Sequence, residues 1–359
     1  MPPREAPTTK KTVAVTGASG YLATKLIRSL LDGGEIERVL GFDVVPPTIT
    51  HDRFVFDQID VRSSALEGRL QGVDVLVHLA FIMDPIRDEA EMRDVNVNGS
   101  QNAFRSAAKA GVGKIVYTSS ATVYGAHPDN PVPLTEDSPL RANLDFSYPA
   151  HKLEVEYVVR ELRDEFPSTL VTVFRPAIVF GPNVDNTWSH LLEAPLFFGV
   201  QGYRPPLQFV HEDDVASALR LAVAQDLDGV YNLAAEGFLE ADEILGIVGR
   251  HQFEIPEPVA FSLLDRMWSL GLAEAPSGML HYVMHPWVVS TEKLTQAGFT
   301  CKYSNRETFI EAAEKARGRL RLGDRSFRRQ DLARGAALGA GVAAALFATR
   351  RVRRRARAA

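Results

Sequence analysis

One short stretch near the start of the chain decides the fold: Thr12-Val13-Ala14-Val15-Thr16-Gly17-Ala18-Ser19-Gly20-Tyr21-Leu22-Ala23. Its first five residues are small, apolar or β-branched, which is typical of a buried strand. Two glycines then interrupt the run, and apolar residues recur with helical spacing until Gly33. The stretch therefore predicts a strand, a tight glycine turn and a helix.

This turn has the features of a phosphate-binding loop. Gly17 would permit the tight turn, and Gly20 would let the backbone approach a pyrophosphate. The amide groups and the positive dipole end of the following helix would attract the anion. The candidate cofactor contacts in this turn are Gly17, Ser19, Gly20, Tyr21 and Leu22.

The ends of three later predicted strands add further candidate contacts. Asp43 ends the second strand, where its carboxylate can accept hydrogen bonds from both adenosine ribose hydroxyls and repel a 2′-phosphate. No arginine follows it, so we expect NAD rather than NADP. Asp60 and Val61 follow the third strand, and Asp60 either reaches the adenine edge or is a solvated turn residue. Leu79 and Ala80 end the fourth, at the edge where open α/β sheets bind ligands.

Strands and helices alternate along the first half of the chain. Predicted strands cover residues 12–16, 38–42, 53–56, 73–79, 114–118 and 170–174, and helical stretches such as 89–110 lie between several of them. The alternation predicts an α/β fold, a doubly wound parallel sheet (Rossmann) with helices on both faces. We assign residues 12–180 to an NAD-binding domain and 181–318 to a smaller C-terminal substrate lobe. The segment at about 207–235 is expected to return to the first domain.

The composition excludes several classes of protein. Cys301 is the single cysteine among 359 residues, which rules out an intramolecular disulfide and a multi-cysteine zinc site and favours a reducing, cytoplasmic setting. The net charge is −5, but residues 319–359 hold 12 Arg against 2 Asp, so residues 1–318 carry about −15. An acidic body argues against nucleic acid as the main partner.

His281 and His285 have metal-ligand spacing without the accompanying glutamate, so we expect no metal site.

Both ends of the chain are expected to lie outside the folded body. Residues 1–11 are polar and proline-rich with no secretory signal, which predicts a disordered N-terminus. Residues 319–359 form a basic tail, in which the uncharged segment 335–349 precedes six arginines. This segment is shorter than the roughly 20 apolar residues of a spanning helix, but its glycines and flanking arginines suit a cytoplasmic membrane face. Membrane contact through residues 335–357 and a disordered or loosely helical tail both stay open.

Tyr148 and Lys152 form the clearest candidate for chemistry, in Tyr148-Pro149-Ala150-His151-Lys152. One helical turn separates the two, so their side chains share a face. Because an ammonium beside a phenol favours the phenolate, we expect Lys152 to lower the pKa of Tyr148 toward the working pH. Tyr148 is then a candidate general acid and base.

Together these motifs resemble the extended short-chain dehydrogenase/reductase family, the NAD-dependent epimerase/dehydratase group. The resemblance covers roughly residues 12–315, and it also rests on His78-Leu79-Ala80, Asn96-Val97-Asn98-Gly99, Ser119-Ser120-Ala121-Thr122-Val123-Tyr124-Gly125 and Arg175-Pro176. It implies that Tyr148 is the catalytic acid/base and that Lys152 binds the nicotinamide ribose. It implies that Ser120 bonds the reacting oxygen, that Asn96 supports the active-site helix or a relay water, and that Ala177 contacts the cofactor. A homodimer through paired helices is also implied.

Two positions depart from the sugar-nucleotide members of that family. Those members usually have Asn where this chain has Ile178, and a diphosphate-binding Arg where it has Leu207, although Arg204 could replace that clamp. We therefore favour an NAD-dependent oxidoreductase or epimerase that transfers hydride at a secondary alcohol or ketone of an apolar or lipid-linked small molecule. The alternative is a nucleotide-sugar 4-epimerase similar to UDP-glucose epimerase. A second alternative is a non-catalytic protein that senses the dinucleotide.

Overall fold

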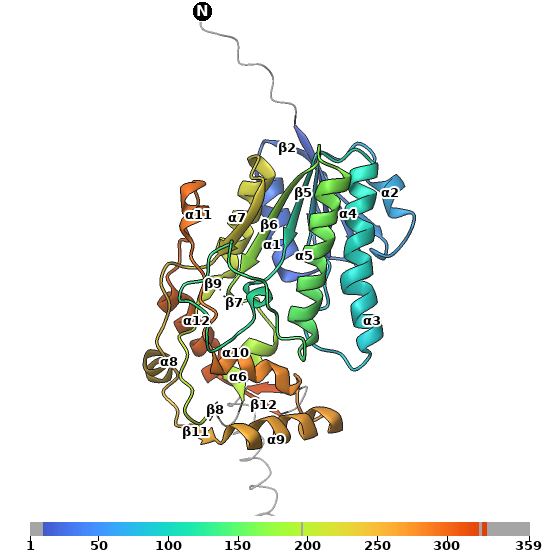
Figure 1. Cartoon of the computed structure of the whole chain (residues 1–359). Helices are drawn as coiled ribbons and strands as arrows, with labels where there is room; N and C mark the ends of the chain where they lie inside the picture. The colour runs from blue at the N-terminus through green and yellow to red at the C-terminus, as the bar shows by residue number, and fades with distance from the viewer. Residues whose placement is uncertain (1–9, 195–196, 323–324, 329–359) are drawn as a thin grey trace, which may run out of the picture.

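A computed structural model describes residues 10–194, 197–322 and 325–328 of the chain. Its centre is a parallel sheet of seven strands in the order β10-β6-β5-β4-β1-β2-β3 (Figure 1). The strand order reverses between β1 and β4, which is the position where open α/β sheets bind ligands. The strands are β1 (Lys11–Thr16), β2 (Ile36–Asp43), β3 (Phe54–Gln58), β4 (Val75–His78), β5 (Lys114–Thr118), β6 (Leu170–Pro176) and β10 (Gly229–Leu233).

Helices cover both faces of this sheet (Figure 1). One face carries α1 (Tyr21–Asp32), α7 (Glu212–Ala224) and α11 (Glu292–Gln296), and the other carries α2 (Leu66–Arg69), α4 (Gly99–Lys109) and α5 (Ser147–Glu165). Successive strand residues point to opposite faces. Val13 and Val15 therefore pack with α1 and α7, whereas Ala14 packs with α4 and α5. The predicted doubly wound α/β sheet is confirmed.

The stretch 89–110, predicted as one helix, is helical throughout but changes its winding. It consists of α3 (Glu89–Arg93), a single π-helical turn η1 (Asp94–Asn98) and α4. Gly99 follows the π turn where Val61 leaves no space, because a Cβ on Gly99 would lie 2.7 Å from Val61 Cγ2. The π turn places Asn96 in the interior, where it is fully buried.

The second half of the chain builds a smaller lobe at the carboxyl ends of the strands. Two short parallel pairs form there, β7 (Ile178–Phe180) with β9 (Phe209–His211), and β8 (Phe197–Val200) with β11 (Gln252–Ile255). The other elements of this half are α6 (Thr187–Glu193), α8 (Ala241–Val248), α9 (Glu257–Leu270), η3 (Ser277–Leu280), α10 (His281–Met284), α12 (Asn305–Arg317), β12 (Arg319–Leu322) and β13 (Arg325–Arg328). A short helix of the first half, η2 (Ala121–Tyr124), follows β5.

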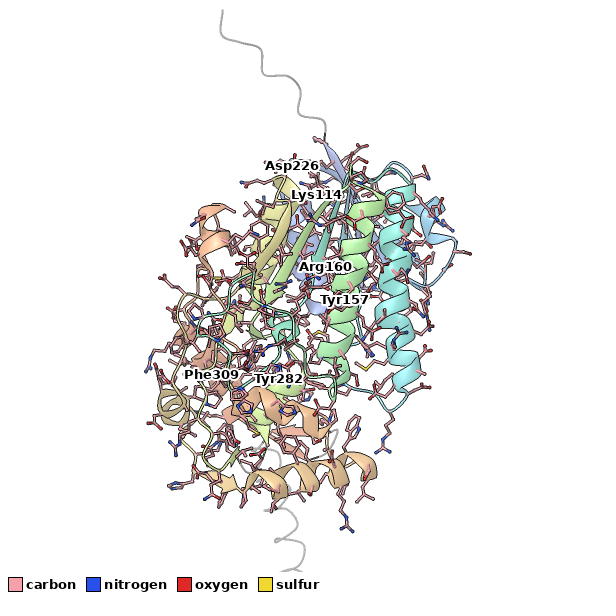
Figure 2. All side chains as sticks on the ribbon, in the orientation of Figure 1. Lys114, Tyr157, Arg160, Asp226, Tyr282 and Phe309 are labelled. Carbon is pink, nitrogen blue, oxygen red and sulfur yellow. The ribbon has the colours of Figure 1, made fainter. Side chains whose placement is uncertain are left out.

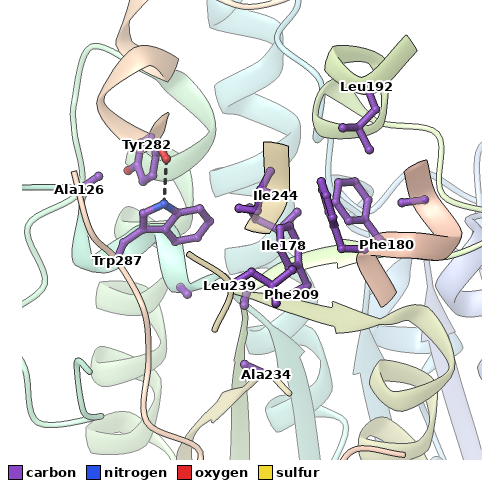
Figure 3. Close-up of a cluster of buried hydrophobic side chains, with 14 of the residues drawn as sticks. Ala126, Ile178, Phe180, Leu192, Phe209, Ala234, Leu239, Ile244, Tyr282 and Trp287 are labelled. Atoms are coloured by element: carbon purple, nitrogen blue, oxygen red, sulfur yellow. Dashed lines mark hydrogen bonds between the residues drawn. The ribbon is translucent and has the colours of Figure 1, made fainter. Parts of the chain in front are cut away.

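One apolar cluster joins the lobe to the rest of the molecule (Figure 3). It brings Ile178 and Phe180 of β7 together with Phe209 of β9 and with residues from α8, α10 and α12. Within it, the Trp287 indole N–H donates to the Tyr282 carbonyl oxygen at 3.0 Å, so the buried indole keeps a polar partner. The lobe is thus held by long-range packing.

Residues 212–233 also belong to the main sheet layer, because α7 packs on α1 and β10 pairs with β6. Lys114 of β5 holds the end of α7 (Figure 2). Its ammonium lies 2.7 Å from Asp226 Oδ1 and donates to the Ala222 and Gln225 carbonyl oxygens at 3.1 and 2.7 Å. A cation at a helix C-terminus satisfies carbonyl groups that the helix leaves over. The domain boundaries at residues 180 and 318 stay predictions.

The predicted disordered N-terminus lies almost entirely outside the described residues, and so does the apolar tail segment 335–349 with the arginines after it. Among the residues that the structure describes, no helix has the length and apolar character needed to cross a bilayer.

Candidate active site

The glycine turn lies at the carboxyl end of β1, directly against the end of β4. Gly17 has φ +69°, and a Cβ there would lie 2.7 Å from Ala80 N and 2.8 Å from the Leu79 carbonyl carbon. Gly20 caps α1 without a side chain, and the first turn of the helix carries no acidic residue. The N-terminal amides of α1 therefore face an open end that fits an anionic pyrophosphate.

The Tyr21 side chain, also on this turn, points a polar atom into the interior. Its hydroxyl is buried and has no hydrogen-bond partner among the described residues. Burial, followed by the nearby Tyr148 and Glu212, raises the pKa of this phenol well above its usual value. An unsatisfied buried hydroxyl is costly, so Tyr21 carries a polar group that the described residues leave without compensation.

Asp43 stands at the end of β2, beside this turn. Its two carboxylate oxygens accept the backbone N–H groups of Ser19 at 3.0 Å and Val45 at 3.1 Å. The Ser19 hydroxyl donates to the Val45 carbonyl oxygen. Each carboxylate oxygen can accept further bonds, so Asp43 is oriented and still able to bind a ribose diol. Leu22, on the first turn of α1, is partly buried against the apolar layer below.

Asp60 is more constrained than the sequence suggested. Arg62 donates to both of its carboxylate oxygens, at 2.7–3.2 Å, and also contacts Glu91 and Asp94 at 2.9 Å. These bonds from Arg62 lower the pKa of Asp60. Val61 is buried and its carbonyl oxygen accepts a bond from Asn102 at 2.6 Å. The side chain of Asp60 thus belongs to an ion cluster, and adenine contact stays a prediction.

Ser120, Tyr148 and Lys152 come together at the carboxyl end of β5. Tyr148 and Lys152 lie on α5, whereas Ser120 caps the short helix η2 that follows β5. The Tyr148 phenol lies near enough to Ser120 for that serine to lower its pKa, and the Ser120 hydroxyl accepts a hydrogen bond from the Thr122 hydroxyl at 2.9 Å. The neighbouring Ser119 instead donates to Glu156 at 2.6 Å. Ser120 is therefore the serine of the pair that faces the phenol.

The prediction that Lys152 lowers the pKa of Tyr148 is wrong for the protein alone. Burial raises the pKa of Tyr148 to about 12, although the nearby Ser120 opposes the rise. Burial also lowers the pKa of Lys152 to about 7. The Lys152 ammonium donates to the Thr118 carbonyl oxygen at 2.7 Å and lies 5.8 Å from the Tyr148 ring centre. Burial outweighs the charge effect because both groups lose water.

Phe81 was not predicted as a site residue, although its ring contacts both Lys152 and Tyr148. Its ring centre is 3.6 Å from the Lys152 ammonium, and the ring meets the Tyr148 ring edge-on at 5.8 Å. Asn96 fixes this segment, because its side chain accepts the Ile82 N–H at 2.7 Å and donates to the Ile82 carbonyl at 2.9 Å. Asn96 also lies 3.4 Å from His151 of α5. Ala177, the last predicted contact, is buried and its N–H donates to Leu233.

A buried polar network lies beneath these residues. Arg175 bonds Glu156 through two contacts, Nε–Oε1 at 2.9 Å and Nη2–Oε2 at 2.5 Å, and both side chains are about 4% exposed or less. Arg175 also donates to the Tyr124 hydroxyl at 2.7 Å, which in turn donates to Asn232. The network ties α5 to β6 and so fixes the helix that carries Tyr148. Among the described residues, no group of His, Cys, Asp and Glu could hold a metal ion.

A cavity of about 520 Å³ lies in the lobe. Its walls are apolar and come from β7, α6, β8, α8, α9 and η3, and both departures noted in the sequence, Ile178 and Leu207, line it. Ring contacts connect it to Tyr148. These run from Tyr148 to Phe146 at 6.3 Å, on to Tyr282 at 6.1 Å, to Trp287 at 5.3 Å, and to the cavity residue Trp188 at 6.0 Å. The cavity and the phenol thus share one apolar cluster.

The charged side chains at the cavity are already paired. Arg204 lies 2.7 Å from Asp242 and 3.1 Å from Glu254. His190 lies between Asp185, at 2.6 Å, and Glu274. Neither Arg204 nor His190 offers the uncompensated charge that a diphosphate would need.

Comparison with known proteins adds to this geometry. The sequence pattern described as the NAD dependent epimerase/dehydratase family matches residues 13–234. An uncharacterized protein of Mycobacterium tuberculosis is 29% identical over 315 residues, 85% of this chain and 84% of that protein. An N-acetyl-alpha-D-glucosaminyl-diphospho-ditrans,octacis-undecaprenol 4-epimerase of Escherichia coli is 31% identical over 183 residues, 50% of this chain and 52% of that protein. The dTDP-glucose 4,6-dehydratase of Streptomyces venezuelae, solved with NAD bound, has a TM-score of 0.68 at 21% identity and covers 85% of this chain and 97% of its own.

Proposed function

Because the chain belongs to the NAD-dependent epimerase/dehydratase family, we propose that it is an NAD-dependent enzyme that transfers hydride at a secondary alcohol or ketone of an apolar substrate. The observation that carries the choice of substrate is the apolar cavity of about 520 Å³ in the lobe, which shares an apolar cluster with Tyr148 and in which Arg204 and His190 are paired with carboxylates.

The residues at the carboxyl ends of β1 and β2 fit NAD. The open N-terminus of α1 would bind the pyrophosphate, and the oriented Asp43 carboxylate would accept the adenosine ribose hydroxyls. Lys152 would donate to the nicotinamide ribose. When bound, NAD takes up or returns the hydride, which is chemistry that no side chain of the protein supplies.

Tyr148 and Ser120 are assigned to the substrate oxygen. That oxygen must lose a proton when its carbon is oxidised and regain one when it is reduced. With a pKa of about 12, Tyr148 holds its proton at neutral pH and is ready to donate it in the reducing direction. A charged Lys152 would favour the phenolate needed for the oxidising direction. Ser120 would hold the oxygen by a hydrogen bond while the proton moves.

The substrate class follows from the lining of the cavity. A sugar nucleotide brings two phosphate charges, and burying them requires cations that are not already neutralised. Leu207 stands where an Arg would be expected, and Arg204 is held by Asp242 and Glu254. An apolar chain or ring system needs no such partner and would gain from the aliphatic and aromatic walls.

The test uses the full-length protein and measures NADH absorbance with a panel of sterols and prenyl alcohols, and it measures the epimeric product with UDP-sugars and dTDP-sugars, because an epimerase returns the hydride and forms no net NADH. We expect turnover with apolar alcohols and none with sugar nucleotides. The reverse result would overturn the substrate assignment and leave a nucleotide-sugar 4-epimerase.

Tyr148→Phe should keep NAD affinity and lose turnover by orders of magnitude. Tyr157→Phe is the matched control, because Tyr157 is an exposed phenol on the same helix. Equal turnover of Tyr148→Phe and wild type would reject the acid/base role, and a protein that binds NAD but turns over nothing would be a sensor.

A further inference from the structure

Helix α9 is poorly buried for its composition. Of its 14 residues only Ala260 is buried, although the helix contains Val, Phe, Leu, Met and Trp side chains. Leu263, Leu264 and Met267 line the apolar cavity. The helix is therefore a wall with the cavity on one side and an outer surface that no described element covers completely.

The outer side of this wall is apolar as well. The exposed apolar residues of α9 and its neighbours, called the α9 face below, are Phe198 53%, Phe253 53%, Val259 53%, Leu263 46%, Leu270 64% and Leu272 64% exposed. Phe198 of β8 and Phe253 of β11 contact each other with ring centres 6.2 Å apart. Single exposed apolar residues are ordinary, but a group on neighbouring elements indicates an interaction surface.

The α9 face continues into the cavity. Three residues of the face, Phe198, Leu263 and Leu272, also line the cavity. Leu191, which is 40% exposed, lines the cavity as well. An apolar ligand could thus move from the face to the cavity walls along apolar side chains that belong to both. This continuity favours a lipid phase as the occupant, because a protein partner seated here would close the entrance.

The sequence that follows the described residues is strongly basic. The described chain ends at Arg328, and the preceding strand β12 contacts α6 and α12 of the lobe. In Figure 1, α9, β8, β11 and β12 lie together at the end opposite the first residues of β1. The sequence continues for 31 residues and includes Arg350, Arg351, Arg353, Arg354, Arg355 and Arg357. Since α9 itself carries Glu257 and Asp265 against Arg266, the attraction to an anionic surface would come from these arginines.

We propose that the α9 face docks on the surface of an anionic lipid bilayer, from which an apolar molecule enters the cavity. The docking is independent of the hydride chemistry, whereas the entry of substrate rests on the proposed function.

Vesicle flotation of the full-length protein tests the docking without any activity measurement. The probes are phosphatidylcholine vesicles with and without phosphatidylserine. Phe253 and Leu270 are exposed and do not line the cavity, so Phe253→Glu with Leu270→Glu changes the face alone. The matched control is Val55→Glu with Val132→Glu, which adds the same charges at residues 52% and 43% exposed elsewhere. Unchanged circular dichroism would show that both variants fold.

We expect wild type and control to float with anionic vesicles and the face variant to lose about tenfold or more of its binding. Replacing the six arginines by Gln should remove the preference for phosphatidylserine. Equal flotation of the face variant and wild type would overturn the proposal, since the tail would then bind alone. Failure of wild type to float would also overturn it. If gel filtration showed that the face variant converts a wild-type dimer to a monomer, without any effect of vesicles, the occupant would be a second copy of the chain.

Discussion

Replacing Lys152 with methionine should make the protein more stable below neutral pH, although Lys152 is assigned to the active site. Lys152 is 4% exposed, and burial lowers its pKa from the usual 10.5 to about 7. That drop corresponds to about 5 kcal/mol by which the native state disfavours the charged form. Methionine has a similar length and no charge. Because methionine leaves the Thr118 carbonyl oxygen without its donor, the gain in stability is reduced by about 1–3 kcal/mol. The expected net gain is about 2–4 kcal/mol at about pH 6.

This gain must shrink as the pH rises. Between pH 7 and 10.5 the unfolded chain binds the Lys152 proton and the native protein does not, so the stability of wild type increases with pH. The methionine side chain of the Lys152→Met variant does not titrate, so that increase is absent in the variant. We expect the stability difference between the two proteins to fall by about 2–3 kcal/mol from about pH 6 to about pH 9.

Urea unfolding of both proteins at the two pH values measures this difference directly, because all other titrating groups cancel. Lys109→Met is the matched control, since Lys109 is an exposed lysine on α4 and its replacement should give no comparable pH dependence. A stability difference that is the same at both pH values would refute the reasoning. So would a Lys152→Met protein that is less stable than wild type at about pH 6.

Two further predictions test the scaffold around the site. Gly17→Ala should abolish NAD binding in a fluorescence titration, because the added Cβ would lie 2.7 Å from Ala80 N. Gly72→Ala is the control. Gly72 also has a positive φ but no atom within 4 Å of an added Cβ, so this variant should lose only stability. Arg175→Met should lower the free energy of unfolding, measured in urea, by about 3–5 kcal/mol, because it leaves the Glu156 carboxylate buried without its cationic partner. Adding Glu156→Leu should restore part of that free energy. If it restored none, the ion-pair explanation would be contradicted.

The parts of the site that the sequence predicted well depend on local geometry. Gly17 and Gly20 fix a turn between one strand and one helix, and Asp43 follows from the end of the next strand. The fold class follows in the same way, since each strand and helix carries its own apolar period. Tyr148 and Lys152 lie on one helix face because four residues make about one turn.

The pKa values could not be predicted in this way. The sequence shows that an amine stands near a phenol, which predicts a lower phenol pKa. It does not show that the Phe81 ring covers the amine, or that both groups lose their water. Phe81 reaches them because Asn96, in a π turn 14 residues after Ile82, holds the backbone of Ile82. Burial is a property of the assembled fold, and it reversed the expected direction for Tyr148.

The proposed substrate cavity was harder still to predict, because its walls come from segments between residues 178 and 309. Ile178 and Leu207 gave a cue in the sequence, because each stands where sugar-nucleotide members usually have a polar residue. Burial of apolar groups can supply the binding free energy that such polar groups would have contributed. Two charge-assisted hydrogen bonds to a diphosphate would supply about 3–6 kcal/mol. Burying about five methylene groups against apolar walls supplies about 4 kcal/mol. Apolar walls could therefore hold a substrate about as firmly as a phosphate clamp, which is consistent with the proposal that the same hydride chemistry serves an apolar molecule.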